Sequence, residues 1–211
     1  MIQQKFTATA SPSLHKAGKL TLHYTSYLWC RPYLDLQPST SFVLDDGTGL
    51  AVGYLLGCPD TQVFAARIQE QFLPSLDAAI DIPPPKPGSN EVQFADDPAL
   101  WAQHELYNNL SSSLVKPDTP ELLKDYPAHL HIDILPAYQG QGHGPKLLEA
   151  WENEMRNLGI KGCHLGMDPA NNGAGRFYQR QGWRLFKELV NGRASGEEKE
   201  MGGGVILVKK L

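Results

Sequence analysis

One segment in the second half of the chain constrains the fold more than any other. Residues His129–Leu135 alternate polar and apolar side chains, which is the period of a β-strand, and Pro136 ends the pattern. Three glycines follow within residues 140–144, and apolar side chains then recur at helical spacing up to Leu158. This order predicts a strand, a glycine-rich turn and an amphipathic helix, which together form a building unit of α/β proteins.

The other elements are predicted from β-prone runs, helical spacing and turn residues. Ser41–Leu44 and Leu50–Leu56 flank an Asp/Gly-rich turn, which predicts an antiparallel hairpin. Further strands are expected at residues 5–9, 160–167, 183–189 and 205–210. Helices are expected at residues 63–72, 98–111, 120–124 and 171–182, with a mixture of helix and loop at 20–36. The order of these elements predicts an α/β domain with a mixed sheet.

The length of 211 residues suits one domain that carries an insertion. Residues 82–90 contain four prolines and a glycine, a composition that excludes helix and central strand and predicts an exposed loop. The pieces on either side of this loop are too small to fold well alone, so we expect a single domain over residues 1–211. Residues 60–125 then form a helical and Pro-rich insertion between the third and fourth strands, with the strand at 5–9 counted as the first.

The charge pattern narrows the classes of partner. The net charge is −4 with scattered lysines and arginines, so the chain lacks the electrostatic footprint of a nucleic-acid or anionic-membrane binder. No run approaches the roughly 18 apolar residues that a membrane span requires, and no apolar stretch follows a basic start, so we expect a cytoplasmic protein. Cys30, Cys58 and Cys163 are expected to be free thiols. This balance is compatible with a cationic substrate such as an amine.

The glycine turn at Gln139–Gly144 is a candidate anion site. The main-chain N–H groups in the first turn of a helix have no partner within the helix, and the helix dipole favours negative charge there. Glycines let a phosphate approach the main chain without an intervening side chain. A nucleotide P-loop is excluded because no G-K-[ST] follows, and the pattern G-x-G-x-x-G is missed by one residue. A plain structural turn is the alternative.

His129, His131 and Asp133 form a partial metal-binding pattern, H-x-H-x-D. Neutral imidazoles and a carboxylate would suit zinc. Metallo-hydrolases with this pattern add a further histidine, and Ile134 occupies that position here. The alternation of polar and apolar residues also requires a strand, whereas such metal sites lie on loops. We therefore expect no metal.

Two motifs, in order along the chain, carry a family resemblance. The first, Q/R-x-x-G-x-G/A, stands between a strand and a helix, and the second, N-x-x-A-x-x-F-Y, stands on the following helix. They are met by Gln139, Gly142 and Gly144, and by Asn171, Ala174, Phe177 and Tyr178. The chain therefore resembles the GNAT superfamily of acyl-CoA N-acetyltransferases, most clearly over residues 41–57 and 128–189. This resemblance implies a GNAT-like mixed, splayed β-sheet flanked by helices, and transfer of an acetyl group from acetyl-CoA to a small-molecule primary amine.

The resemblance also implies roles for individual residues. Ile132, Ile134 and Leu135 would line the pantetheine arm of acetyl-CoA in the gap beside their strand. The pyrophosphate would be held by main-chain N–H groups of the loop that comprises Gln139, Gly140, Gln141, Gly142, His143 and Gly144. Asn171 is either a coenzyme contact or a helix cap. Tyr178 matches the tyrosine that protonates the departing coenzyme thiolate.

The same reaction needs a base that deprotonates the ammonium group of the acceptor. His131 and Asp133 lie on the polar side of their strand, and Asp168 follows the next strand at the edge of the gap. Each of the three is alternatively a hydrogen-bonded structural group. We favour Asp168 and His131, since a histidine has an unperturbed pKa of about 6.5. The aromatic residues within 20–36 are expected in core packing, with a wall of the acceptor pocket as the alternative.

A narrower resemblance is carried by residues 126–136 and 53–61. They look like the branch related to the acetyltransferase-like domain of eukaryotic O-GlcNAc hydrolases, which implies an amino sugar such as glucosamine, or a protein amine, as acceptor. It equally implies the alternative of a non-catalytic acetyl-CoA-binding or protein-interaction module. The long connection at 190–204 would let a C-terminal strand exchange between copies, so a homodimer is expected.

Overall fold

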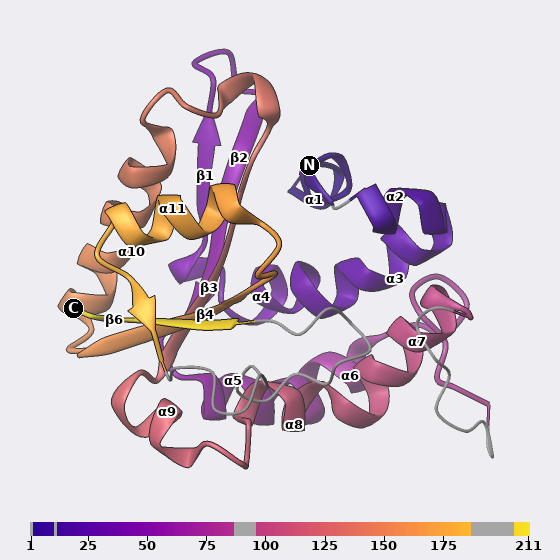
Figure 1. Ribbon diagram of the computed structural model, residues 1–211. Helices are drawn as coiled ribbons and strands as arrows, with labels where there is room; N and C mark the ends of the chain where they lie inside the picture. Colours follow the sequence, from indigo (N-terminus) through magenta and orange to yellow (C-terminus); the bar gives the residue numbers. More distant parts are fainter. Residues whose placement is uncertain (1, 11, 87–95, 187–204) are drawn as a thin grey trace.

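The computed structural model describes residues 2–10, 12–86, 96–186 and 205–211 (Figure 1). Within these residues, six strands form one mixed sheet in the order β1-β2-β3-β4-β6-β5. The strands are β1 Phe42–Asp45, β2 Ala51–Cys58, β3 Ala128–Ile134, β4 Gly162–Met167, β5 Arg184–Leu185 and β6 Val205–Lys210. The helices are α1 Ile2–Thr9, α2 Pro12–Ala17, α3 Lys19–Trp29, α4 Arg31–Leu36, α5 Thr61–Arg67, α6 Leu73–Ser75, α7 Pro98–His104, α8 Leu110–Val115, α9 Pro120–Asp125, α10 His143–Asn157 and α11 Asn172–Arg180.

The predicted order of elements in the second half of the chain is confirmed. The alternating segment is β3, the amphipathic segment is α10, and Gly159 has the positive φ of 77° that suits the end of a helix. The strands expected at 160–167 and 205–210 are β4 and β6. The strand expected at 183–189 is β5, and its last three predicted residues lie outside the described ones.

The hairpin predicted in the first half is also confirmed. Strands β1 and β2 pair antiparallel, and β2 pairs antiparallel with β3 on its other edge. Every residue of β2 is buried, because helices cover both faces of the sheet at this point (Figure 1). Strand β2 is therefore central, and it fixes the position of β3 beside it.

The strand predicted at residues 5–9 is wrong, because these residues belong to helix α1. The Thr9 hydroxyl donates to the Lys5 carbonyl at 2.9 Å, and the Ala10 N–H donates to the Phe6 carbonyl at 3.0 Å. Phe6 is buried in the cluster that includes Tyr27 and Tyr54, so the segment covers a face of the sheet instead of extending it. A short run of this kind does not distinguish helix from strand by its period. As a result, the predicted insertion at 60–125 follows the second strand of the sheet and precedes the third.

The insertion is mostly helical, as predicted. Helix α5 continues through the π-helical residues Ile68–Phe72 into α6, and α7 continues through Glu105–Asn109 into α8. Pro74 lies inside the short α6 and does not end the helix before it, since a new turn begins at Leu73 after the π-helical residues. Residues 82–86 have no regular structure, and the remainder of the predicted proline-rich loop lies outside the described residues.

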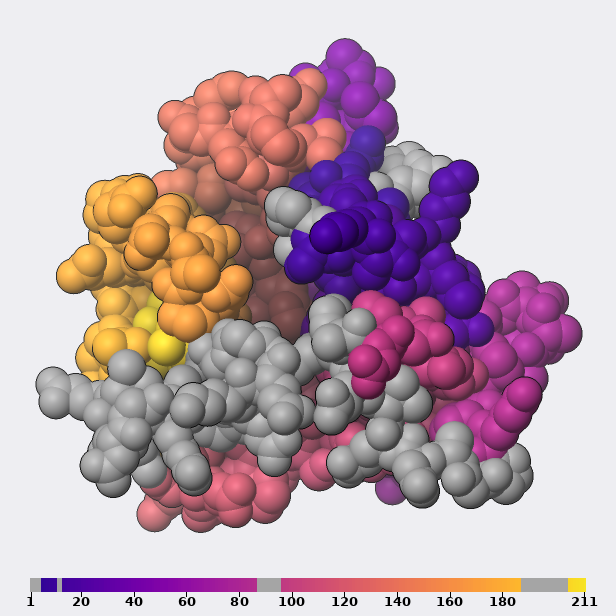
Figure 2. All heavy atoms as spheres, turned by 45° about the vertical axis from the view of Figure 1, so that its right-hand side comes forward, coloured from indigo at the N-terminus to yellow at the C-terminus, as the bar shows by residue number. Residues whose placement is uncertain are grey.

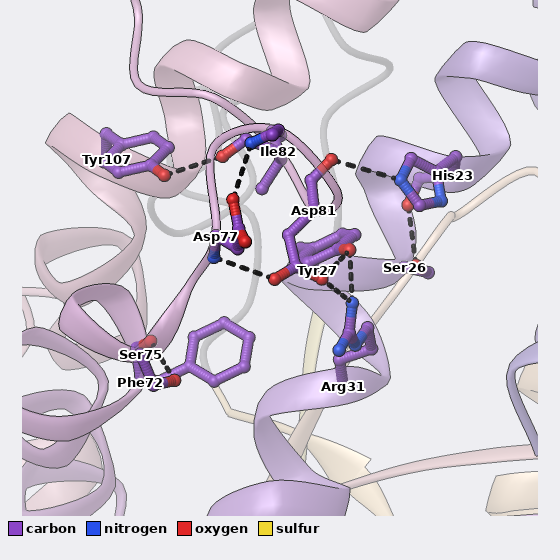
Figure 3. A network of polar contacts seen from close by, with 11 residues as sticks. His23, Ser26, Tyr27, Arg31, Phe72, Ser75, Asp77, Asp81, Ile82 and Tyr107 are labelled. Carbon is purple, nitrogen blue, oxygen red and sulfur yellow. Dashed lines mark hydrogen bonds and ion pairs between the residues drawn. The ribbon is translucent and has the colours of Figure 1, made fainter.

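A polar network ties the end of the first part of the insertion to α3 and α4 (Figure 3). The Asp81 carboxylate accepts hydrogen bonds from the Tyr27 hydroxyl at 2.8 Å, from Arg31 Nη1 at 2.7 Å and from the Asp77 N–H at 2.9 Å. These contacts, with the Asp77 N–H first, lower the pKa of Asp81 to about 2. The Asp81 carbonyl also lies 3.3 Å from His23 Nε2. The network holds the junction between α3 and α4, next to residues that face the sheet.

The state of the cysteines and the length of the helices were both subjects of prediction. Cys30, Cys58 and Cys163 are free and buried, as predicted. No helix in the described part of the chain combines the length and the apolar character that crossing a lipid bilayer demands.

Alternate side chains of β2 and β3 enter different hydrophobic clusters. Leu55 and Leu130 pack with α10, where Trp151 is fully buried. Tyr54 packs on the opposite face with the N-terminal helices, in the cluster that contains Tyr33. Because β3 shares the register of β2, its polar residues His129, His131 and Asp133 face the N-terminal helices.

We predict that Gly57→Ala destabilises the fold. A Cβ atom at residue 57 would lie 2.6 Å from Nε1 of Trp151 and 2.8 Å from the His129 carbonyl oxygen, so both β3 and α10 would have to shift. Overpacking of this kind costs on the order of 1–3 kcal/mol, measured as the free energy of unfolding in denaturant. Gly175→Ala is the control, because the nearest atom to its added Cβ is Met167 Cε at 3.6 Å. Equal stability of the two variants would contradict the close contact.

Candidate active site

The parallel pairing of β3 with β4 ends after two residue pairs. Ala128 pairs with Cys163 and His129 with His164, and the two strands then diverge. Beyond this point β4 pairs with β6 and β3 pairs with β2. The predicted splay of the sheet is therefore confirmed, and beyond His129 no strand among the described residues lies beside this edge of β3.

The main-chain groups of two residues face this opening. The Leu135 N–H donates to the Val52 carbonyl at 2.9 Å, so residue 135 faces β2. Residues of an antiparallel strand alternately face and turn away from the partner strand. Ile134 and Ile132 therefore turn their N–H and C=O groups toward the β4 side. Their side chains pack with the cluster on the α10 face, and the side chain of Leu135 is half-buried.

The glycine turn leads from β3 into α10 at the same end of the sheet. Gly140 and Gly142 have φ angles of 72° and 82°, which favour glycine, and Gly142 is the N-cap of α10. A Cβ atom at either residue would have no neighbour within 4 Å among the described atoms, so the turn is open on its outer side. The N–H groups of His143 and Gly144, in the first turn of α10, have no acceptor within the helix. This geometry suits an anion.

The two glutamines of the turn hold its shape. Gln139 Nε2 donates to the Ile134 carbonyl at 2.7 Å, and Gln141 Nε2 donates to the Ala137 carbonyl at 2.8 Å. Both side chains are therefore occupied with the main chain of the turn. The groups that remain for a ligand are main-chain N–H groups, as the predicted role of this loop requires.

Gly144 serves the packing of α10 on α11. A Cβ atom at residue 144 would lie 3.0 Å from the ring of Phe177, so the ring would have to move by a few tenths of an ångström to admit a side chain there. The next residue on α11 is Tyr178, which is buried and packs edge-on against Trp183. Burial and, second, the nearby Asp133 carboxylate raise the pKa of Tyr178, so the phenol is protonated at neutral pH. Tyr178 is thus a proton donor within the electrostatic range of Asp133.

The two other sequence-predicted residues of this edge have structural contacts. Asn171 Oδ1 accepts a hydrogen bond from the Ala174 N–H at 3.0 Å, which confirms the predicted helix cap. The exposed Asp168 carboxylate accepts from the Ala170 N–H at 2.8 Å and forms the turn before α11. Neither residue is brought to the face of β3 that carries His131 and Asp133.

Asp133 is the one acidic residue on the polar face of β3. Its carboxylate accepts a hydrogen bond from the Tyr54 hydroxyl at 2.5 Å. Burial raises the pKa of Asp133 to about 6, against the opposing effects of the hydroxyl groups of Tyr54 and Thr9. A carboxylate with this pKa is ionised at neutral pH and accepts a proton more readily than an ordinary aspartate does.

His131 is the neighbour of Asp133 on this face. Burial and, second, repulsion from His164 lower the pKa of His131 to about 4, so the imidazole is neutral at pH 7. Its Nε2 lies 3.1 Å from the hydroxyl oxygen of Tyr33, which also lies 2.6 Å from Nε2 of His129. Tyr33 therefore stands between two histidines, and its single hydroxyl proton serves only one of them.

The directions of these hydrogen bonds follow from the end of the hydrogen-bond series at Thr61 and Pro127. The Thr61 hydroxyl donates to the Pro127 carbonyl at 2.6 Å, so it must accept from His129 Nδ1 at 2.7 Å. His129 Nε2 then carries a lone pair and accepts from the Tyr33 hydroxyl, which in turn accepts from His131 Nε2. Nδ1 of His131 therefore has the free lone pair. The series of hydrogen bonds ends at the Pro127 carbonyl, which cannot accept a transferred proton. It therefore orients His131 and does not relay protons.

An open cavity of about 200 Å³, exposed to solvent on its outer side, lies in front of these residues. It is lined by Phe6, Thr9, Ala10, Leu14, Trp29, His131 and Asp133. In Figure 2 the surface is hollowed between the orange α11 and the indigo N-terminal helices. The cavity thus brings the two β3 residues predicted as base candidates against side chains of the first three helices.

A metal is not favoured by the contacts of the H-x-H-x-D pattern. Both histidines are turned to the Tyr33 hydroxyl, and Asp133 is turned to Tyr54. In the described part of the chain, no group of three or more His, Cys, Asp or Glu side chains has an arrangement that could hold a metal ion.

Tyr33 and Trp29 belong to the aromatic segment at 20–36. The structure places Tyr33 in the buried hydrogen-bond chain and Trp29 in the cavity wall, the alternative given for this segment. Sequence reasoning missed two further residues, Tyr54 and Thr9. Tyr54 lies directly opposite Asp133 in the β2–β3 register, so the pairing of the strands would have identified it. Thr9 gave no signal, because its segment was taken for a strand.

We predict that Tyr33→Phe releases the fixed tautomer of His131. Without the hydroxyl oxygen, Nε2–H of His131 loses its acceptor, and both neutral tautomers become populated. Imidazole nitrogen chemical shifts measured by NMR should show a single Nε2-protonated form in the native protein and a mixture in the variant. Tyr107→Phe is the control, since that hydroxyl donates to the Ile82 carbonyl. A single unchanged tautomer in Tyr33→Phe would contradict the hydrogen-bond chain.

Comparison with known proteins identifies proteins that are similar to this chain. A family model described as an acetyltransferase (GNAT) domain matches residues 116–185. The crystal structure of a protein named SsHAT is 30% identical, with a TM-score of 0.71, over 99% of this chain and 93% of its own. A polyamine N-acetyltransferase of Drosophila melanogaster is 18% identical, with a TM-score of 0.53, over 100% of this chain and 94% of its own. An agmatine N-acetyltransferase is 18% identical, with a TM-score of 0.51, over 99% of this chain and 88% of its own. The last two show the same fold.

Proposed function

The chain belongs to the GNAT family of acetyltransferases, and we propose that it moves the acetyl group of acetyl-CoA to a primary amine, with Asp133 as base and Tyr178 as acid. The observation that carries this proposal is the position of β3. One edge of this strand faces an opening that leads to the glycine turn, and its polar side chains face a cavity. The two reactants can therefore approach the same strand from different directions.

The residues beside the opening fit the coenzyme. The main-chain groups of Ile132 and the N–H of Ile134 are turned to the gap and suit the amide groups of a pantetheine arm, with Leu135 beside them, while the Ile134 carbonyl accepts from Gln139. The N–H groups at the start of α10 and the open glycines suit the pyrophosphate. Gln139 and Gln141 keep the turn in shape, so Gly140, Gly142, His143 and Gly144 would contribute through the main chain. Acetyl-CoA supplies the activated acetyl group as a thioester.

Asp133 is our proposed base. It is ionised at neutral pH, and it is the only acidic residue among the described residues that line the cavity. His131 is a weaker base because burial holds it neutral with a low pKa, and it offers the Nδ1 lone pair as a hydrogen-bond acceptor for the amine. Asp168 and Asn171 lie at the end of the gap, where a coenzyme contact would be compatible with their turn and cap contacts.

We predict that Asp133→Asn lowers kcat by at least about 100-fold, the scale typical of a lost general base. In the native enzyme kcat/KM should fall as the pH drops below about 6, because protonated Asp133 cannot accept a proton. That fall should disappear from the residual activity of the variant. Asp168→Asn is the matched control and should keep both the rate and the pH profile. A larger loss in Asp168→Asn would transfer the role of base to that residue.

We predict that Tyr178→Phe lowers kcat by roughly 10- to 1000-fold and leaves the Kd of acetyl-CoA nearly unchanged. The phenol would donate a proton to the departing thiolate, and phenylalanine keeps the packing against Trp183. Measurement with a donor thioester whose thiol is more acidic should reduce the loss, since such a thiolate departs with less help. A loss of equal size with both donors would assign Tyr178 a structural role.

The identity of the acceptor is part of the proposal. The Drosophila melanogaster and agmatine enzymes act on small amines, and they share the fold with this chain. An amino sugar such as glucosamine, implied by the resemblance to the acetyltransferase-like domain of O-GlcNAc hydrolases, stays a prediction. So does a homodimer, since the connection at 190–204 lies outside the described residues.

The experiment that tests the proposal has two steps. Calorimetric titration with acetyl-CoA measures coenzyme binding, and a free-thiol assay over a panel of amines then measures transfer. Binding followed by thiol release with one class of amine would support the enzyme. Binding with no release on any amine would favour the alternative, a coenzyme-binding or protein-interaction module. Absence of binding would overturn the assignment of the glycine turn.

A further inference from the structure

We infer that Thr61, the first residue of α5, is a positioning residue that decides which nitrogen of His131 carries the proton. The series of hydrogen bonds between these two residues can run in either of two directions, and the Thr61 hydroxyl selects one of them. In the selected direction His131 accepts a hydrogen bond from the acceptor amine. This last step rests on the proposed acetyl transfer, whereas the direction itself does not.

The series is reversible because each of its members can both donate and accept. A hydroxyl group does both, and a neutral imidazole carries its proton on either nitrogen. Burial lowers the pKa of His129 well below its usual range and that of His131 to about 4, so both rings are neutral. Moving the proton of each ring to its other nitrogen and turning the Tyr33 hydroxyl from His129 to His131 reverses the series. No proton enters or leaves in this change.

A donor for the reversed direction is already in place. Cys58 Sγ lies 3.2 Å from Nδ1 of His129, and burial raises the pKa of the Cys58 thiol, so the sulfur keeps its proton. The thiol can therefore donate to Nδ1 when that nitrogen has no proton of its own. His129 would then donate from Nε2 to the Tyr33 oxygen, and the Tyr33 hydroxyl would donate to Nε2 of His131. In this direction His131 would carry its proton on Nδ1.

The Thr61 hydroxyl excludes the reversed direction. Its proton is donated to the Pro127 carbonyl at 2.6 Å, so only lone pairs of the oxygen face Nδ1 of His129 at 2.7 Å. An unprotonated Nδ1 would place two acceptors against each other without water, since Thr61 is fully buried. A thiol is a weak donor and does not compensate for this contact. The proton of His129 therefore stays on Nδ1.

Nδ1 of His131 is the nitrogen that remains for a ligand. His131 lines the cavity, and its Nε2 is occupied by Tyr33. Among the described residues, the buried side-chain nitrogens without a partner are the indole groups of Trp151 and Trp183, so Nδ1 of His131 is open to a ligand. In the native direction this nitrogen presents a lone pair to an ammonium group, and in the reversed direction it would present an N–H group. Thr61 thus favours an amine acceptor although it does not line the cavity.

Imidazole nitrogen chemical shifts measured by NMR test the direction. In the native protein we expect His129 to be protonated on Nδ1 and His131 on Nε2. Thr61→Val keeps the shape without the hydroxyl and should move the His131 proton to Nδ1, and Thr61→Ser should keep the native pattern. Thr25→Val is the control for the loss of a buried hydroxyl, since Thr25 donates to the Thr21 carbonyl within α3. His129 protonated on Nε2 in the native protein, or an unchanged His131 in Thr61→Val, would overturn the inference.

Kinetics test the consequence for the acceptor, with agmatine, putrescine, 2-phenylethylamine and glucosamine as probes. For each amine that the native enzyme acetylates, KM should rise about 10-fold in Thr61→Val, as expected for one lost hydrogen bond to a cation, and Thr61→Ser should restore it. The kcat and the Kd of acetyl-CoA should stay near their native values. An unchanged KM beside a reversed His131 would overturn its role in binding the amine. Absence of thiol release with every probe would overturn the proposed transfer, and the chemical shifts would still decide the role of Thr61.

Discussion

The early end of the ladder between β3 and β4 is the constraint on which the rest of the site depends. Main-chain polar groups inside a protein are almost always paired, and a sheet normally satisfies them with the neighbouring strand. Here the pairing stops after His129, and the Ile134 carbonyl accepts from the Gln139 side chain instead of from a neighbouring strand. The main-chain groups of Ile132 and the N–H of Ile134 also face away from β2. This edge of β3 lies beside the glycine turn, where the N–H groups in the first turn of α10 have no acceptor within the helix.

The apolar side chains, the polar side chains and the free edge of β3 face three different parts of the site. Its apolar side chains pack toward α10, its polar side chains face the cavity behind α1, and its free edge faces the gap. The hydrogen-bond chain from Pro127 to His131 holds one polar side chain in a single protonation pattern, and the Tyr54 hydroxyl holds the other. The proposed chemistry would therefore take place on a strand inside the sheet, which limits the movement of the groups assigned to bind and transfer protons.

The sequence predicted the parts of the molecule that depend on local pattern. Three features could be predicted because each follows from a few consecutive residues: the alternation in β3, the glycine turn and the Asn171 cap. Helix α1 was missed because a short segment gains its structure from burial of Phe6 against distant aromatic residues. The proposal of Asp133 as base instead of Asp168 could not come from the sequence either, since it depends on burial and on Tyr54, which is 79 residues away in the chain.

The contact of Gly144 with the Phe177 ring joins the loop predicted to bind the coenzyme to the helix that carries the proposed acid. Residue 144 lies in the first turn of α10, and Phe177 precedes Tyr178 on α11. A Cβ atom at residue 144 would lie 3.0 Å from the ring, which would have to move by a few tenths of an ångström. Under the proposed roles, variation at this position would therefore affect affinity for the coenzyme and rate of transfer together. Diversity among related chains should accordingly collect elsewhere in the turn.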